Sequence, residues 1–159
     1  MIFVTVGTHG DPFDRLIRAA EALARSGHQV VLQRGTSRVP APSCEVQDFL
    51  TPEQMSRHIA AARIVVTHGG PASILEVPGV PIVVPRRAKY GEHVDDHQVR
   101  FVAHIHHRAH VLDDPADLIV AVARHPEFAA NLGDSPPRRS AEFARDFGRM
   151  VDALVARRR

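Results

Sequence analysis

The chain has 159 residues, which predicts one domain over residues 1–159. Because 44% of its residues are hydrophobic and 24% are charged, it can bury a sizeable core, and this excludes a disordered chain. The formal net charge is only +2, and aromatic residues make up 5% of the chain with no tryptophan. We therefore expect no nucleic-acid partner held by base stacking.

The single cysteine, Cys44, excludes an internal disulfide and fits a reducing compartment, and we interpret it as a small apolar filler. The N-terminal residues lack the basic region of a signal peptide, and no apolar run approaches the roughly 20 residues that span a bilayer. We therefore expect a cytoplasmic protein that reaches any membrane-bound substrate through a partner. Arginines gather at 86–87, 138–139 and 157–159, where basic patches can attract an anionic ligand or a membrane surface; for the last two, a solvated surface is an equally good interpretation.

Short apolar runs alternate with helical patterns along the chain. In chain order they predict strand 2–6, helix 12–26, strand 29–32, strand 45–49, helix 52–62, strand 64–67, a helix of about two turns after Gly70, strand 82–84, helix 94–107, a strand near 111, a helix through 124 and a last helix 139–156. A capping box, 51–54, opens the second helix, and Asp113 or Asp114 caps the helix through 124. Residues 126–137 are expected to be irregular.

Strands that alternate with helices predict a parallel sheet of about six strands with helices on both faces, which is a single Rossmann-like α/β domain. Ligands of such sheets bind beyond the carboxyl ends of the strands. Two glycine turns leave strand ends at that edge, and they contain Gly7, Thr8, His9 and Gly10 in one and His68, Gly69 and Gly70 in the other. Glycine lets the backbone approach a ligand closely, so both turns are candidate phosphate sites.

The stretch 67–98 supplies the other polar groups of a nucleotide-sugar site. Ser73 can donate its hydroxyl to a phosphate oxygen, and Glu76 lies one turn further along the same side of the helix. A carboxylate there would repel phosphate, but it suits the two hydroxyls of a ribose. His97 and Gln98 can hydrogen-bond a sugar. An ordinary helix start with a favourable acid is the alternative interpretation for Ser73 and Glu76.

The ordered motifs H-G-G-x-x-S-x-x-E, G-V-P-I-V-V-P and H-Q resemble the donor-binding signature of GT-B glycosyltransferases. The opening MIFVTVGTHGDPFDRLIRA and the segment YGEHVDDHQ are similar to small donor-binding subunits of two-chain transferases, which correspond to the C-terminal half of family 28 enzymes. Relatives include the two-subunit GlcNAc transferase of the dolichol pathway and bacterial exopolysaccharide transferases. The resemblance covers residues 1–112 well and the rest loosely.

The resemblance implies an inverting transferase subunit that binds a UDP-sugar, such as UDP-GlcNAc, UDP-glucose or UDP-glucuronate. It implies a membrane-anchored, acceptor-binding partner subunit and a polyprenyl-diphosphate-linked saccharide as acceptor, at the inner face of the membrane. In relatives, a glutamine at the position of Gln98 contacts the sugar, whereas the position of His97 varies. His9 is the best local candidate for a general base, but a turn histidine is as good an interpretation, and we expect the base to come from the partner.

Eleven histidines make metal sites worth testing. On a helix, His93 and His97 would share a face with Asp95 and Asp96 between them, so one metal ion could bridge them. A second group consists of His104, His106, His107 and His110. Neither group has a recognisable zinc pattern. GT-B enzymes need no metal to stabilise the leaving diphosphate, so we expect no essential metal and no other cofactor.

Two features leave the function open. Only Val77, Pro78, Gly79 and Val80 separate Glu76 from Pro81, whereas relatives carry a longer helix there, so a non-catalytic UDP-sugar-binding or assembly protein is the alternative. The last helix, 139–156, has an apolar stripe that packs either on the partner or on this domain's own sheet, and we expect docking of 139–159 on the partner.

Overall fold

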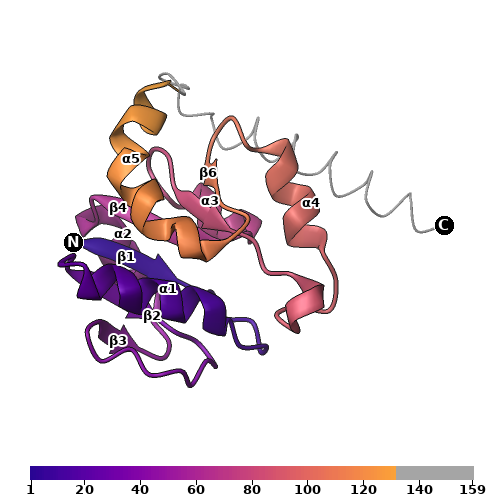
Figure 1. The fold of residues 1–159 in the computed structure, drawn as a ribbon. Coiled ribbons are helices and arrows are strands. Elements are labelled where there is room, and N and C mark those ends of the chain that lie inside the picture. The colour runs from indigo at the N-terminus through magenta and orange to yellow at the C-terminus, as the bar shows by residue number, and fades with distance from the viewer. Residues whose placement is uncertain (132–159) are drawn as a thin grey trace.

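The structure is a computed structural model that describes residues 1–131 of the chain. Six parallel strands form one sheet in the order β3-β2-β1-β4-β5-β6. Figure 1 shows β3, β2, β1 and β4 one after another across the sheet. They are β1 (Ile2–Thr5), β2 (Val30–Gln33), β3 (Glu45–Gln47), β4 (Ile64–His68), β5 (Ile82–Val84) and β6 (His110–Val111). This is the strand order of a doubly wound dinucleotide-binding sheet, and it confirms the predicted fold class.

Helices cover both faces of the sheet. They are α1 (Asp14–Arg25), α2 (Pro52–Ala61), α3 (Pro71–Leu75), α4 (His97–His104) and α5 (Leu118–Asn131), with short 3-10 helices η1 (Ala88–Tyr90) and η2 (Pro115–Asp117). α1 and α5 pack side by side on one face (Figure 1), and their apolar residues share a core with that face. α2, α3 and α4 contribute to two smaller cores on the other face.

The strands are apolar on both faces because both faces are covered. Ile2 and Val4 of β1 belong to the core beneath α1 and α5, whereas Phe3 between them belongs to the core beneath α2. Successive strand residues point to opposite faces, so one unbroken apolar run fills two cores. The inward face of α1 consists of four fully buried side chains: Leu16, Ile17, Ala20 and Leu23.

Local signals fix several element ends where they were predicted. The Thr51 hydroxyl accepts from the Gln54 N–H at 3.2 Å, and the Gln54 side chain accepts from the Thr51 N–H at 2.8 Å, which is the capping box at the start of α2. Asp114 accepts from the Ala116 N–H at 2.9 Å, so it caps η2, which leads into α5. Pro71 occupies the first turn of α3.

Most boundaries lie within two residues of the prediction, and three differ by more. α4 begins at His97 rather than near residue 94, and it ends at His104 rather than near 107. α5 continues through Pro126 to Asn131, where an irregular segment was expected. The stacking of Phe128 on His110, with ring centroids 4.1 Å apart, and the hydrogen bond of His125 to the Val80 carbonyl oxygen at 2.7 Å hold the end of α5 on the body of the domain. This tertiary packing outweighs the bond that Pro126 removes from the helix.

The predicted last helix, 139–156, and its docking lie outside the described residues. Among residues 1–131, no helix has both the length and the apolar character needed to cross a bilayer.

Candidate functional site

The candidate site lies where the strand order of the sheet reverses, between β1 and β4. In open parallel sheets of this kind, ligands bind outside the carboxyl ends of the strands at this switch point. The two predicted glycine turns leave β1 and β4 there, because β1 ends at Thr5 and β4 ends at His68. The fold therefore brings the turns 7–10 and 68–70 together at one edge of the sheet, as expected from the sequence.

The His68 side chain is enclosed by two of the predicted site glycines. Gly7 has a φ of +75°, and a Cβ added to it would lie 2.4 Å from the His68 ring. A Cβ on Gly70 would lie 2.4 Å from His68 Nε2. Both positions therefore need glycine to make room for the imidazole. Gly10 is different, since a Cβ there would meet nothing within 4 Å.

Burial makes His68 a neutral imidazole. Its side chain is enclosed, and desolvation lowers its pKa to about 3, with smaller contributions from the charges of Arg86, His9 and His93. Its Nδ1 lies 3.5 Å from the Thr67 hydroxyl oxygen. At neutral pH His68 can offer a ligand an N–H donor or a lone pair, but no charge.

Gln98 links two loops of the site. Its side-chain Oε1 accepts from the N–H groups of Gly69 and Arg86, each at 3.1 Å, and the residue is buried. A Cβ on Gly69 would lie 2.9 Å from the Gln98 Cβ, so this glycine is needed for the approach of Gln98. Only Nε2 of the amide is left to donate to a sugar hydroxyl, and the Gly69 N–H is already committed to Gln98.

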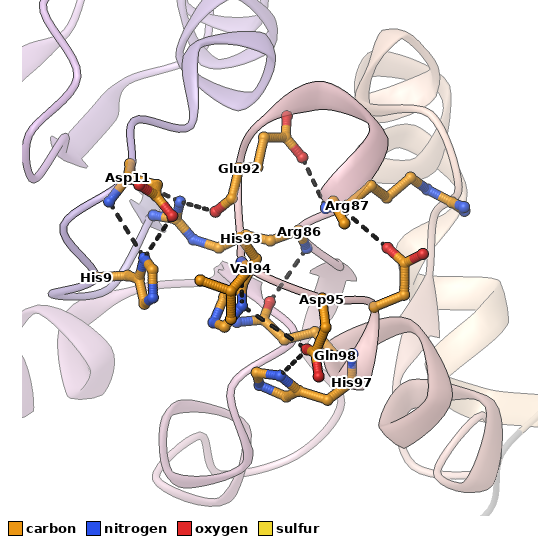
Figure 2. Close-up of polar contacts among 12 residues, drawn as sticks. His9, Asp11, Arg86, Arg87, Glu92, His93, Val94, Asp95, His97 and Gln98 are labelled. Atoms are coloured by element: carbon orange, nitrogen blue, oxygen red, sulfur yellow. Dashed lines mark hydrogen bonds and ion pairs between the residues drawn. The ribbon is translucent and has the colours of Figure 1, made fainter.

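Arg86 is a site residue that sequence reasoning placed wrongly. Its side chain is fully buried, not part of a surface basic patch, and its guanidinium donates to the carbonyl oxygens of Val6 (2.9 Å), Asp11 (2.8 Å), Pro12 (3.3 Å) and Glu92 (3.0 Å). Burial lowers the pKa of Arg86 to about 10, which leaves the group charged at neutral pH. Arg86 thus ties the loop after β1 to the loop after β5 (Figure 2).

Glu92 completes this connection. Its carboxylate accepts from Arg15 Nε at 2.6 Å and Nη2 at 3.0 Å, and from the Arg87 N–H at 2.9 Å. Arg87 pairs in turn with Asp113 at 2.7 Å. Neither Arg15 nor Glu92 was singled out from the sequence, because long-range pairing between a helix and a loop 77 residues away leaves no local pattern.

The remaining predicted donor-site residues are less enclosed. Thr8 and Gly10 are exposed, and Ser73 is half-buried in α3. Glu76 is exposed and caps the C-terminal end of α3, which is only five residues long. The short helix predicted from Pro78 is therefore confirmed, and Glu76 is the C-cap residue of α3, with helical backbone angles.

Three histidine rings lie in a row beside this site. The His9 and His93 ring centroids are 4.1 Å apart, and those of His93 and His97 are 4.3 Å apart. His9 and His93 come from the loops after β1 and β5, and His97 begins α4 (Figure 2). His9 Nδ1 accepts from the Asp11 N–H at 3.2 Å, so a neutral His9 carries its proton on Nε2. The unprotonated nitrogen of His9, which a general base would use, is therefore already the acceptor of the Asp11 N–H.

Asp95 lies against the same row. Its Oδ1 is 2.6 Å from His97 Nδ1 and accepts from the His97 N–H at 3.0 Å, and its Oδ2 lies 3.4 Å from Arg100. The His97 N–H, more than the His97 ring and Arg100, lowers the pKa of Asp95 to about 2, so the carboxylate is ionised at neutral pH. Histidine, cysteine, aspartate and glutamate side chains can ligate a metal ion. Within residues 1–131, only His93, Asp95 and His97 form a group of three of these that are close enough together to hold one. The other histidines, at 104, 106, 107 and 110, form no such group in the same range.

A cavity of about 380 Å³ opens elsewhere, between the β6 edge and α5. It is lined by side chains that include His110, Arg124 and Phe128, and none of the predicted site residues contributes to it. The candidate site therefore rests on the sheet topology and the residues at the switch point, not on this cavity.

Comparison with known proteins shows similarity to glycosyltransferases. A family model described as the Glycosyltransferase family 28 C-terminal domain matches residues 1–126. Among solved structures, the chain is similar to one described as the glycotransferase of kitacinnamycin, with 20% identity, a TM-score of 0.56 and coverage of 82% of this chain and 37% of that one. It is also similar to the spinosyn forosaminyltransferase SpnP, with 17% identity, a TM-score of 0.50 and coverage of 97% of this chain and 43% of that one.

These similarities place the fold among GT-B glycosyltransferases. The chain spans less than half the length of either structure. No curated protein sequence matches the chain.

Proposed function

The chain belongs to the family of glycosyltransferase family 28 C-terminal domains, and from that premise we propose that it is the donor-binding subunit of an inverting UDP-sugar transferase. The donor would be a UDP-hexose such as UDP-GlcNAc, UDP-glucose or UDP-glucuronate. The acceptor, a polyprenyl-diphosphate-linked saccharide, would be presented by a membrane-anchored partner subunit at the inner face of the membrane.

One observation carries the proposal: the two glycine turns and the S-x-x-E pair meet at the switch point of a doubly wound sheet. This is the position at which such sheets bind nucleotides. The turns after β1 and β4 lie on neighbouring strands, and α3 follows the second turn directly. A diphosphate at this position would be held by Gly70 and Ser73, with the Gly7–Gly10 turn on its other side.

Each remaining role follows from the position of the residue. Glu76 would accept hydrogen bonds from the ribose hydroxyls, for which an exposed carboxylate is suited. Gln98 would donate through Nε2 to the sugar, because its Oε1 already accepts two N–H groups. His68 would donate to a phosphate oxygen as a neutral imidazole.

The acceptor hydroxyl would attack the anomeric carbon of the sugar and displace UDP. Hydrogen-bond donors fixed at the diphosphate would stabilise the charge that develops on it. The general base would come from the partner, since His9 Nδ1 accepts from the Asp11 N–H in this arrangement. No metal ion would be essential for this transfer.

Donor binding can be tested on the chain by itself. Replacing Glu76 by alanine should weaken UDP binding by about 1.5–3 kcal/mol, roughly ten- to 150-fold, which is what a hydrogen bond to a charged group contributes. Isothermal titration calorimetry with UDP measures the change. The exposed Glu45, at the far edge of the sheet, gives a matched control in Glu45→Ala, which should bind UDP as the wild type does.

A second ligand isolates the ribose contact. The wild type should bind UDP more tightly than 2′-deoxy-UDP, and Glu76→Ala should lose this preference. Equal affinity of wild type and Glu76→Ala for UDP would overturn the ribose assignment. Failure of the wild type to bind UDP at all would overturn the proposed function.

The second candidate function is a non-catalytic UDP-sugar-binding or assembly protein. The observation in its favour is the five-residue α3, which leaves Glu76 exposed beyond the helix. The two functions separate in a transfer assay with the partner present. A catalytic subunit loses transfer on Glu76→Ala in proportion to UDP binding, whereas an assembly protein shows no transfer that depends on Glu76.

A further inference from the structure

We propose that His93, Asp95 and His97 form a binding site for a zinc-class divalent cation beside the candidate donor site. The three residues stand at alternate positions in the sequence: His93 and Asp95 lie on the turn that enters α4, and His97 is the first residue of α4. One ligand atom from each lies within 4.8 Å of the other two. The proposal concerns metal binding alone, so it does not depend on the proposed sugar transfer.

The nitrogen and oxygen atoms already face one another. Asp95 Oδ1 lies 2.6 Å from His97 Nδ1 and 3.9 Å from His93 Nδ1 (Figure 2). Ligand atoms in a tetrahedral zinc site lie roughly 3.4 Å apart, given zinc–nitrogen bonds of about 2.0–2.1 Å. Small side-chain rotations would bring both distances to this value, with the metal replacing the proton between His97 and Asp95.

The protonation of the two rings suits this arrangement. His93 Nδ1 accepts from the Val94 N–H at 2.9 Å, so in a neutral ring this atom carries the lone pair and Nε2 carries the proton. A metal ion would replace the Val94 N–H as the partner of that lone pair. His97 needs only to move its proton from Nδ1 to Nε2. Two imidazoles and one carboxylate favour zinc, copper or nickel over magnesium or calcium, which prefer oxygen ligands.

The surroundings restrict what else the group can do. The His93 side chain is 9% exposed and is packed between the His9 and His97 rings, whereas the His97 side chain is 41% exposed. A metal can therefore enter from the His97 side. Three protein ligands leave one tetrahedral position for water or another ligand.

Zinc titration of the untagged, full-length chain tests the proposal. The protein is stripped with a chelator, and zinc is titrated in competition with a chromophoric chelator of known affinity. We expect one tightly bound zinc per chain, and we expect a visible absorption spectrum typical of tetrahedral coordination when Co²⁺ replaces it. Magnesium and calcium should not displace the zinc.

Two variants and one control make the result specific. His97→Ala and His93→Gln should each weaken zinc binding by more than about tenfold, since even a change behind the ligands costs 10–100-fold. His106→Ala removes an exposed histidine outside the group and should leave the affinity unchanged. His97 is more exposed than His93, so His97→Ala gives a decision even if the half-buried His93 cannot be replaced without loss of the fold.

The proposal is overturned if both variants bind zinc as the wild type does, or if His106→Ala weakens binding as much as they do. Several weak zinc ions per chain, with no tight one, would also overturn it.

Discussion

His68 shows how much of the site depends on single residues. Its ring lies between Gly7 and Gly70, and neither position has room for a Cβ. In the sequence, Gly7 and Gly70 are interpreted as residues that let a ligand approach the backbone. They also have a structural role, because they make room for the His68 ring. They hold a neutral imidazole at the end of β4, where the loops of two strands meet.

The buried imidazole makes stability depend on pH. The pKa of His68 is about 3 in the folded chain and about 6.5 when unfolded, so between these values the unfolded state binds a proton that the folded state does not. His68 therefore has little effect on the unfolding free energy above pH 6.5, and it lowers that free energy progressively as the pH falls towards 3. At pH 5 the cost from His68 is about 2 kcal/mol.

The substitution His68→Asn should remove this contribution. Urea unfolding at pH 7 and at pH 5 measures it, and the wild type should lose about 2 kcal/mol more between the two pH values than the variant does. His106→Asn, at an exposed position, should behave as the wild type. An equal loss in wild type and His68→Asn would show that His68 is charged in the folded chain.

At the scale of elements, the site is a set of loops joined by two side chains. Gln98 joins the turn after β4 to the loop after β5, and Arg86 joins the loop after β5 to the loop after β1. Each bridge satisfies backbone groups that the strand ends leave unpaired. The loops therefore hold a fixed relation to one another before any ligand binds, which favours a preorganised site.

Replacing Gln98 by methionine tests the first bridge. Methionine keeps the length of the side chain but accepts neither N–H group, so Gly69 and Arg86 would each keep an unpaired buried donor. The expected cost is about 2–3 kcal/mol of unfolding free energy, which urea denaturation measures. Gln29→Met, at an exposed position, should change stability by less than about 0.5 kcal/mol. A neutral Gln98→Met variant would mean that the loops hold together without the amide.

The sheet and most helix starts could be predicted because their signals are local. The periodicity of hydrophobic residues, the glycine turns and capping residues such as Thr51 each act within a few positions of the chain. Arg86 and Glu92 could not be predicted in this way, because burial of a charge is decided by partners up to 80 residues distant. The end of α5 was missed for the same reason, since Phe128 and His125 hold it through contacts with His110 and Val80.

At the scale of the whole molecule, residues 1–131 form one doubly wound sheet with both faces covered. The chain spans 37% and 43% of the two similar glycosyltransferase structures. A sugar transferase needs an acceptor site as well as a donor site, so the proposal assigns the acceptor to a second chain. In the proposed function, this chain would bind UDP and stabilise it as a leaving group.

The positive charge of Arg86 lies close to the proposed position of the diphosphate. Arg86 is a fixed cation whose field reaches the site, since it helps to lower the pKa of His68. With this charge and the hydrogen-bond donors at the turns in place, UDP binding should need no Mg²⁺ or Mn²⁺. Calorimetry in EDTA and in excess Mg²⁺ should give UDP affinities that agree within about twofold, which is about 0.4 kcal/mol. The same comparison on His97→Ala controls for a metal at the neighbouring His93–His97 site. If UDP binds only when Mg²⁺ or Mn²⁺ is present, the ion is part of the donor site, and Asp95 and Asp96 become its candidate ligands.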